Sequence, residues 1–441
     1  MARCASCPAS LPTLERMTAV FAHVHKVLAA AYVVVAFARP ELDERFPRLW
    51  AKLRLHRGPV ADLWALVADA AFWSRDPERA IQAAGSAMAI SRPGSRSDCR
   101  ALGDMLAAGL FHRGSASSPQ RWLDRLLATD PDPDAASTLA WGFDAAMLYR
   151  VCVGRNDELT SHVRRLEAIA AKADPDDPLI AAWLANVRAS WHRAQGRPWA
   201  ALRYSHSAVE RFEQAGYRHF LPYSYAFVGI DLVLIGDFVR GDAELRRSAA
   251  LAQVGSVQAF VASHFAATSA LWQGQSARTH ELTASSQQSA SGKESLPHLL
   301  AALIRADAWI VDGALAEAEA SLAGAEASAA SFPFQATWFH STLARLRLAQ
   351  GRLNEAARAL ERARALHREI GRWHFAKRSA VDLTEVELLL ALGESARARD
   401  LAISARKRLL DEATQLDDSG HRHSYLHRVP DHANLLVLAA G

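Results

Sequence analysis

The stretch that decides the fold is residues 343–366, which read LARLRLAQGRLNEAARALERARAL. Apolar residues recur at helical spacing on both sides of Gly351, over Leu343–Gln350 and Leu353–His367. A glycine just after such a segment supplies the positive-φ residue that ends a helix and turns the chain. Ala344 and Ala356 are small, so two helices can approach closely where they cross. The stretch therefore predicts two antiparallel helices joined by a tight turn.

The same order of small residue, turn glycine and two further small residues recurs along the chain at nearly constant spacing. Copies are found at Ala189, Gly196, Ala201, Ala208; Gly229, Gly236, Gly241, Ser248; Ala267, Gly274, Thr279, Ser286; Ala306, Gly313, Ala318, Ala325; Ala344, Gly351, Ala356, Ala363; and Val386, Gly393, Ala398, Ala405. An earlier copy (Ala68, Arg75, Ala80, Ala87) has Arg75 in the glycine position, and a degenerate copy surrounds Gly154.

Helix–turn–helix units of about 34 residues are typical of tetratricopeptide repeats, and a longer spacing implies longer helices or loops. The sequence therefore predicts an all-α fold, a right-handed tetratricopeptide-like (TPR-like) α-solenoid with a period of about 38–42 residues.

This repeat divides the chain into four segments. Residues 1–10 are expected to be a disordered N-terminus, and residues 11–134 a helical segment with irregular repeats. The regular solenoid is expected over residues 135–415. Residues 416–441 are expected to be a linker and a C-terminal cap, because the ends of a solenoid need to be covered.

Composition and charge disfavour several classes of protein. The 51 basic and 47 acidic side chains nearly cancel, and the basic ones form no runs, so no nucleic-acid partner is expected. Four cysteines are too few for a disulfide framework, which favours a reducing compartment. The apolar run Val27–Ala38 is shorter than the roughly 20 residues needed to span a bilayer. These features predict a cytoplasmic protein with no membrane partner.

The repeat pairs with Gly-Arg turns, at Gly196-Arg197 and Gly351-Arg352, resemble the TPR region of bacterial STAND-type signal-transduction ATPases. The ending Ser424-Tyr425-Leu426-x-x-Val429-Pro430-x-His432-Ala433 is similar to the tail that closes many myxobacterial members. Members of that family often carry an ATPase module, sometimes with a Ser/Thr kinase or a transcription-factor domain. The resemblance, over residues 59–441, implies a helical-repeat sensor in bacterial signalling.

The sequence departs from the family in its nucleotide-binding motifs. The only Gly-Lys pair, Gly292-Lys293, is followed by Glu294, so the hydroxyl that would hold magnesium is missing. Gln287 stands where the first glycine of a P-loop belongs, and no kinase glycine loop or His-Arg-Asp segment is found. The resemblance therefore implies a stand-alone sensor or adaptor, or the separated sensory half of a split system, whose partner is a kinase, an ATPase or a transcription factor.

Few residues suggest catalysis or metal binding. The histidines His421, His423, His427 and His432 lie close in sequence, but their spacing does not impose a metal-ligand geometry, so a solvated tail is favoured. Cys4-x-x-Cys7 has no second pair. No Gly-x-Ser-x-Gly, His-Glu-x-x-His or Gly-x-Gly-x-x-Gly motif is present. We therefore expect no catalytic residue, no metal and no cofactor.

A binding groove is the favoured site, because the first helix of each TPR pair lines the concave face. The inner positions recur at fixed offsets before each turn glycine. They include Trp183, Asn186, Arg193, Tyr223, His264, Thr268, Trp272, Asp307, Trp338, Ser341, Arg345 and Glu387. Tryptophan and arginine anchor protein interfaces out of proportion to their number. The alternative for any one of these residues is packing between repeats.

Three functions remain open at this point. The first is a non-enzymatic regulator or adaptor whose groove binds a peptide or protein segment. The second is a small-molecule sensor with a closed groove, and the third is an enzyme with a pocket inside the array. An open trough would favour a peptide and a closed aromatic cavity a metabolite, whereas a buried carboxylate or histidine in such a cavity would favour catalysis.

Overall fold

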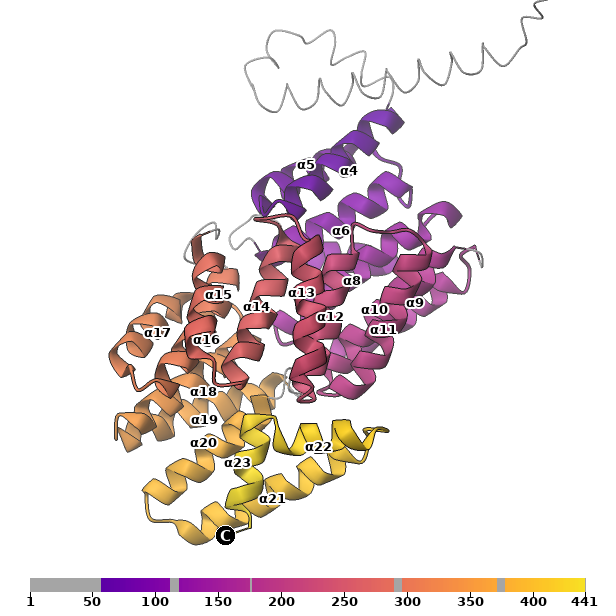
Figure 1. Ribbon diagram of the computed structural model, residues 1–441. Helices are drawn as coiled ribbons and strands as arrows, with labels where there is room; N and C mark the ends of the chain where they lie inside the picture. Colours follow the sequence, from indigo (N-terminus) through magenta and orange to yellow (C-terminus); the bar gives the residue numbers. More distant parts are fainter. Residues whose placement is uncertain (1–56, 112–118, 175–176, 289–295, 371–376, 441) are drawn as a thin grey trace, which may run out of the picture.

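The computed structural model describes residues 57–111, 119–174, 177–288, 296–370 and 377–440 (Figure 1). Within these ranges all regular structure is helical, without a strand, and no helix is long and apolar enough to cross a bilayer. The features predicted at residues 1–56 and at Gly292-Lys293 lie outside the described residues.

The helices follow one another as antiparallel pairs. The pairs are α4 (Arg57–Trp73) with α5 (Pro77–Ile90), α6 (Arg96–Phe111) with α7 (Pro119–Ala128), α8 (Ala136–Cys152) with α9 (Leu159–Ala170), α10 (Pro178–Ala194) with α11 (Pro198–Gln214), α12 (Leu221–Leu234) with α13 (Phe238–Leu251), α14 (Val257–Trp272) with α15 (Ser276–Gln288), α16 (Leu296–Val311) with α17 (Leu315–Ala329), α18 (Pro333–Ala349) with α19 (Leu353–Ile370), α20 (Lys377–Ala391) with α21 (Ser395–Ala413), and α22 (Ser419–His427) with α23 (Pro430–Leu438). Short 3-10 turns, η1 (Pro133–Ala135) and η2 (Asn156–Glu158), precede α8 and α9.

The turns within the pairs confirm the predicted register. Gly154, Gly196, Gly236, Gly274, Gly313, Gly351 and Gly393 all have φ between 68° and 79°. Arg75, which stands in the glycine position of the first copy, has φ 63° and is the single non-glycine residue with positive φ in the described ranges. The chain is therefore the predicted TPR-like α-solenoid, and its repeat extends to the first described pair.

Small residues bring paired helices together where they cross, as expected. A Cβ added at Gly229 of α12 would lie 2.6 Å from Cγ of Leu245 and 3.1 Å from the carbonyl oxygen of Gly241. A Cβ at Gly241 of α13 would in turn lie 3.0 Å from the carbonyl oxygen of Gly229. A side chain at either position would therefore push α12 and α13 apart.

The solenoid returns onto itself after every five helix pairs. Helix α4 contacts α14, α6 contacts α16 and α8 contacts α18. Nε2 of Gln335 lies 3.6 Å from Sγ of Cys152, although 183 positions separate them in sequence, and His421 lies 3.3 Å from Asp237, at a separation of 184. We call α4–α13 the first turn and α14–α23 the second turn of the superhelix. The two turns pack against each other, so much of the superhelix axis is filled by side chains.

The last two helices contact both their neighbours and the first turn. Helix α23 packs on α20 and α21, and buried Tyr425 of α22 belongs to the same apolar cluster as Leu232 and Ile235 of the first turn. A Cβ at Gly236 would lie only 2.4 Å from the carbonyl oxygen of Ser424. Figure 1 shows these C-terminal helices, in yellow, below the ends of α11–α13. The end of the chain thus closes the second turn against the first.

Candidate functional site

A pocket opens on the inner face of the first turn, among α4, α6, α8, α10 and the segment that precedes α12. Its volume is about 50 Å³. It is lined by Asp69, Trp73, Arg96, Arg100, Ser137, Thr138, Trp141, Leu179, Trp183, Tyr217 and Phe220. Five of these residues are aromatic and three are charged, and the other three are Ser137, Thr138 and Leu179.

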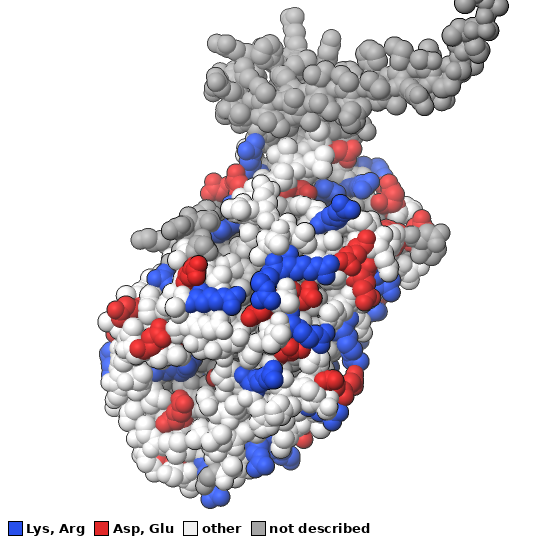
Figure 2. Space-filling model, in the orientation of Figure 1, with Lys and Arg blue, Asp and Glu red and all other residues white. Residues whose placement is uncertain are grey.

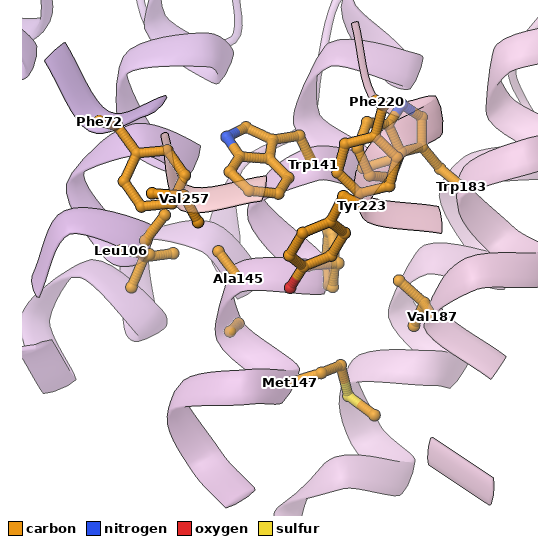
Figure 3. Packing of buried hydrophobic residues seen from close by; sticks show 14 of the residues in the cluster. Phe72, Leu106, Trp141, Ala145, Met147, Trp183, Val187, Phe220, Tyr223 and Val257 are labelled. Carbon is orange, nitrogen blue, oxygen red and sulfur yellow. The ribbon is translucent and has the colours of Figure 1, made fainter. Parts of the chain in front are cut away.

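Three tryptophans from the first helices of different pairs form the wall. The rings of Trp73 and Trp141 stack with centroids 5.5 Å apart, and those of Trp141 and Trp183 are 5.7 Å apart. The ring centroid of Phe220 lies 4.5 Å from that of Trp183 and 4.9 Å from that of Tyr223. Figure 3 shows these rings beside Trp141. All five rings are at least nine-tenths buried, so the wall is rigid and continuous with the core.

The close crossing of α6 and α8 at Gly103 positions Trp141, the middle one of the three tryptophans. A Cβ at Gly103 of α6 would lie 2.4 Å from Cδ1 of Trp141 and 3.1 Å from the backbone nitrogen of Gly142. Because Gly103 has no side chain, α6 and α8 can approach closely and the indole can lie directly over the α6 backbone. This crossing lies between two helices of successive pairs, outside the turn-based spacing used to find the repeat.

Carboxylates fix two of the three indoles in this stack. Nε1 of Trp73 donates to Oδ1 of Asp69 and Nε1 of Trp141 donates to Oδ1 of Asp104, each at 3.0 Å. Asp104 is fully buried, and its Oδ2 has no hydrogen-bond partner among the described residues. Burial, and then the charge of Asp69, raise the pKa of Asp104 well above its ordinary value. Burial therefore favours the neutral form of the Asp104 side chain, whose Oδ1 orients Trp141.

The mouth of the pocket carries an excess of positive charge. Nη1 of Arg100 lies 3.5 Å from Oδ2 of Asp69, and both side chains are one-quarter exposed. Arg96, one helical turn earlier on α6, is exposed and makes no ion pair with any described residue. Burial raises the pKa of Tyr217 to about 12, so its hydroxyl stays protonated. The mouth thus offers one cation that no carboxylate in the described part of the chain neutralises.

Six of the twelve residues predicted for the groove are buried instead of exposed. They are Trp183, Asn186, Arg193, Tyr223, Asp307 and Ser341, each less than 9 % exposed. Trp183 lines the pocket, and Tyr223 packs on Phe220 behind it. The burial follows from close packing between neighbouring pairs. Phe220 covers Trp183, Asp144 accepts from Asn186, and Asp231 accepts from Arg193.

Two of these buried residues belong to a polar network along the axis of the first turn. Nε and Nη2 of Arg193 donate to the two oxygens of Asp231, each at 2.8 Å, and the guanidinium lies 4.4 Å from the ring centroid of Phe227. Nδ2 of Asn186 donates to Oδ1 of Asp144 at 2.8 Å. Burial raises the pKa of Asp144 to about 7. This network connects α8, α10 and α12 inside the core.

The remaining predicted residues lie around the second turn and keep some exposure. His264, Thr268 and Trp272 on α14 are half-buried, as are Trp338 and Arg345 on α18, whereas Glu387 on α20 is exposed.

Asp307 connects several of these residues. Its Oδ2 accepts from Nε1 of Trp338 at 3.0 Å, and its Oδ1 accepts from Thr342 at 3.0 Å and from Arg345 at 3.1 Å. Burial lowers the pKa of Arg345, but Asp307, Asp431 and Glu387 together raise it by more. Arg345 therefore sits in an acidic environment that includes α23.

The C-terminal histidines do not converge. Nδ1 of His432 is buried 2.8 Å from the carbonyl oxygen of Tyr425, and His421 faces Asp237. The rings of His423 and His427 lie against each other with centroids 4.7 Å apart. No group of three or more His, Cys, Asp or Glu side chains within the described ranges is arranged to hold a metal ion.

Of the pocket residues, the groove prediction includes Trp183 alone, and it does not extend to the two degenerate copies of the repeat. Asp69 and Trp73 stand at inner positions relative to Arg75. Trp141 and Asp144 precede Gly154 at the offsets at which Trp183 and Asn186 precede Gly196. The signal was therefore present in the repeat register. By contrast, the repeat register does not indicate Arg96 and Arg100, the charged residues that α6 contributes to the pocket.

The pairs, their turn residues and the inner first helices define the class of this protein, a TPR-like α-solenoid. No family model matches the chain, and no curated protein matches it. Among solved structures, it is similar to a Rap protein complexed with competence and sporulation factor, with 13 % identity over 73 % of this chain and 92 % of that chain and a TM-score of 0.49. It is also similar to IFIT1 with m7Gppp-AAAA (14 % identity, 86 % and 90 % covered, TM-score 0.46) and to yeast Tom70 (10 % identity, 95 % of each chain covered, TM-score 0.38). We base the fold on the chain's own helices and turns.

Proposed function

We propose that this protein is a non-catalytic regulator or adaptor that binds a segment of a partner protein, with the aromatic pocket of the first turn as the anchor. The observation that carries the proposal is the pocket itself, in which buried tryptophan rings meet Arg96, a cation without an ion-pair partner among the described residues. Buried aromatic side chains and arginines dominate the binding energy of protein interfaces. A concave pocket that combines aromatic side chains with precisely placed polar groups is a common form of ligand site.

The fixed positions of the pocket side chains support binding. The indoles of Trp73 and Trp141 are held by Asp69 and Asp104, so they lose little rotamer freedom when a ligand arrives. Thr138 also lines the pocket and is half-buried, so it is a position at which a larger side chain can be placed to fill the pocket. The pocket is therefore both pre-formed and open to a direct test.

The groove residues of the second turn extend this proposal. His264, Thr268 and Trp272 on α14, with Trp338 and Arg345 on α18 and Glu387 on α20, keep exposed surface on inner helices. Because α4 packs on α14, the pocket and this surface lie on helices in contact. We propose that a bound segment continues from the pocket toward α14, α18 and α20.

A mechanism follows from the closure of the superhelix. The two turns meet through the α4–α14, α6–α16 and α8–α18 contacts, so a ligand that spreads or tightens the first helices shifts these contacts. The change would reach the C-terminal pair, which contacts the first turn at Gly236. We propose that this movement is relayed to a kinase, an ATPase or a transcription factor in the bacterial cytoplasm.

The charge distribution fits a protein partner better than a nucleic acid. On the face shown in Figure 2, basic and acidic side chains lie side by side. Nucleic-acid binding depends on several cations acting together on phosphates. The absence of a nucleic-acid partner thus stays a prediction, one that salt-dependent binding to DNA or RNA would contradict.

The test is affinity capture from the native host with the full chain and two variants. Thr138→Phe fills the pocket, and Thr160→Phe on α9 is the matched control outside it. We expect the wild type and the control to retain one protein partner that the pocket variant loses, with equal thermal unfolding of all three. A partner held equally by all three would contradict the proposal. A co-purifying small molecule that is lost from Thr138→Phe would favour the sensor function instead.

A further inference from the structure

Resting on the proposed function, we propose that the pocket binds the C-terminal residue of the partner, with a branched aliphatic side chain among the tryptophans and the terminal carboxylate at Arg96 and Arg100. Two observations carry this inference, the size of the pocket and the charge at its mouth. A third argument, from chain geometry, favours a terminal carboxylate over an internal acidic side chain.

The size of the pocket selects the side chain. A cavity needs roughly 10–15 Å³ of this volume for each water-sized group, and a cavity that binds benzene measures about 150 Å³. The pocket measures about 50 Å³, which is about a third of the benzene-binding cavity and about four times the volume needed for one water-sized group. Leucine and isoleucine side chains have four carbon atoms. A phenyl or indole ring exceeds the volume, and an alanine methyl leaves most of it empty.

The charge at the mouth selects an anion. Asp69 already accepts from Nε1 of Trp73 and faces Arg100 at 3.5 Å, so its negative charge is engaged. Arg96 makes no ion pair with a described residue, and it lies on the same face of α6 as Arg100 because the two are one helical turn apart. Two guanidinium groups against one engaged carboxylate leave a site for one further carboxylate.

Chain geometry favours the terminal carboxylate over an acidic neighbour. In an extended peptide, successive side chains point to opposite faces, so an Asp or Glu beside the anchor residue points away from the pocket. The α-carboxylate of a C-terminal residue is attached to the same Cα as its side chain. It therefore stays at the mouth, where Arg96 and Arg100 lie, whenever the side chain is inside the pocket.

The experiment uses isothermal titration calorimetry of the full chain with synthetic probes at millimolar concentration. The probes are acetyl-Gly-Ser-Gly-Leu with a free carboxylate, its C-terminal amide, and the acetyl-Gly-Ser-Gly-Ala and acetyl-Gly-Ser-Gly-Phe acids. We expect the leucine acid to bind at least about tenfold more tightly than each of the others, because amidation removes a charge-assisted hydrogen bond and alanine leaves the pocket unfilled. Arg96→Glu should weaken the leucine acid by a similar factor, and Arg246→Glu, at an exposed position of α13, should leave it unchanged.

The result separates this inference from the proposed function. Equal binding of the leucine amide, or tighter binding of the phenylalanine acid, would overturn the C-terminal assignment. If a partner captured from the host is still lost from Thr138→Phe in that case, the proposed function stands. If no leucine acid binds and Thr138→Phe captures the same partners as the wild type, both fail. Thermal unfolding of Arg96→Glu at the wild-type temperature excludes a folding defect.

Discussion

The two turns of the superhelix share one repeat but differ in what fills their inner face. The same inner position before the turn glycine is occupied by an aromatic residue in three successive pairs of the first turn. These residues are Trp141, Trp183 and Tyr223, and all are at least nine-tenths buried. The corresponding residues of the second turn are Val261, Leu300, Trp338 and Ala380. The repeat therefore fixes the backbone, whereas the side chain at one recurring position decides whether the axis holds an aromatic wall.

The buried charges differ in the same way. Arg193 and Asp231 of the first turn are 3 % and 0 % exposed at their side chains, whereas Arg345, which pairs with Asp307 in the second turn, is 29 % exposed. Asp307 accepts from two further donors, Trp338 and Thr342, whereas Asp231 accepts from one, the hydroxyl of Ser205. The first turn thus depends on its ion pair more than the second does.

The largest expected difference comes from removing the two arginines. Arg193→Ala leaves Asp231 buried without its cation, and we expect a loss of about 3–5 kcal/mol in the free energy of unfolding. Arg345→Ala should cost less, about 1 kcal/mol, because Asp307 keeps two donors and Arg345 is more exposed than Arg193. Urea denaturation followed by circular dichroism measures both. Equal losses would show that the two turns bury their charges alike.

A pH titration tests the axis of the first turn. Burial raises the pKa of Asp144 to about 7, so between pH 4 and 7 the folded state binds a proton that the unfolded state has released. The contribution of Asp144 to stability therefore falls as pH rises through this window and is level above it. Asp144→Asn should remove a decrease of roughly 3 kcal/mol between pH 5 and 8. Asp400→Asn, at an exposed position of α21, should follow the wild type at every pH.

Two turn glycines test the contact between the superhelical turns. Alanine at either position must adopt positive φ, which costs about 1–2 kcal/mol. A Cβ at Gly313 meets no atom within 4 Å, whereas one at Gly236 would lie 2.4 Å from the carbonyl oxygen of Ser424. We expect Gly236→Ala to be less stable than Gly313→Ala by about 2 kcal/mol, because α22 must move. Limited proteolysis should cleave α22 and α23 faster in Gly236→Ala alone, and equal cleavage would contradict the contact.

The smallest expected effect lies at Arg75. Its φ of 63° is unfavourable for a residue with a side chain, and its guanidinium lies 5.3 Å from the ring centroid of Phe260 in the second turn. Arg75→Gly and Arg75→Ala both lose this contact, but only glycine relieves the backbone. We expect the glycine variant to be more stable than the alanine variant by about 1 kcal/mol. A wild type more stable than the glycine variant would show that the Phe260 contact outweighs the backbone cost.

Local sequence determined the helices and their turns. The spacing of Ala344, Gly351 and Ala356 predicts a helix, a positive-φ residue and a close crossing, all of which depend on a few neighbouring residues. The sequence also places Arg75 in the glycine position of the first copy, and its φ of 63° is close to those of the turn glycines. Even the aromatic wall was within reach, since Trp141 and Trp183 occupy one position of the register.

Only the tertiary structure decided which inner residues are exposed. Arg193 can be buried because Asp231, 38 residues later, forms an ion pair with it. The α12–α13 turn is covered because the chain returns to it 184 positions later. The repeat spacing contains no information on the number of pairs in one superhelical turn, which depends on small packing angles summed over successive pairs. The pocket exists because the summed packing angles bring the first helices of different pairs together around one axis.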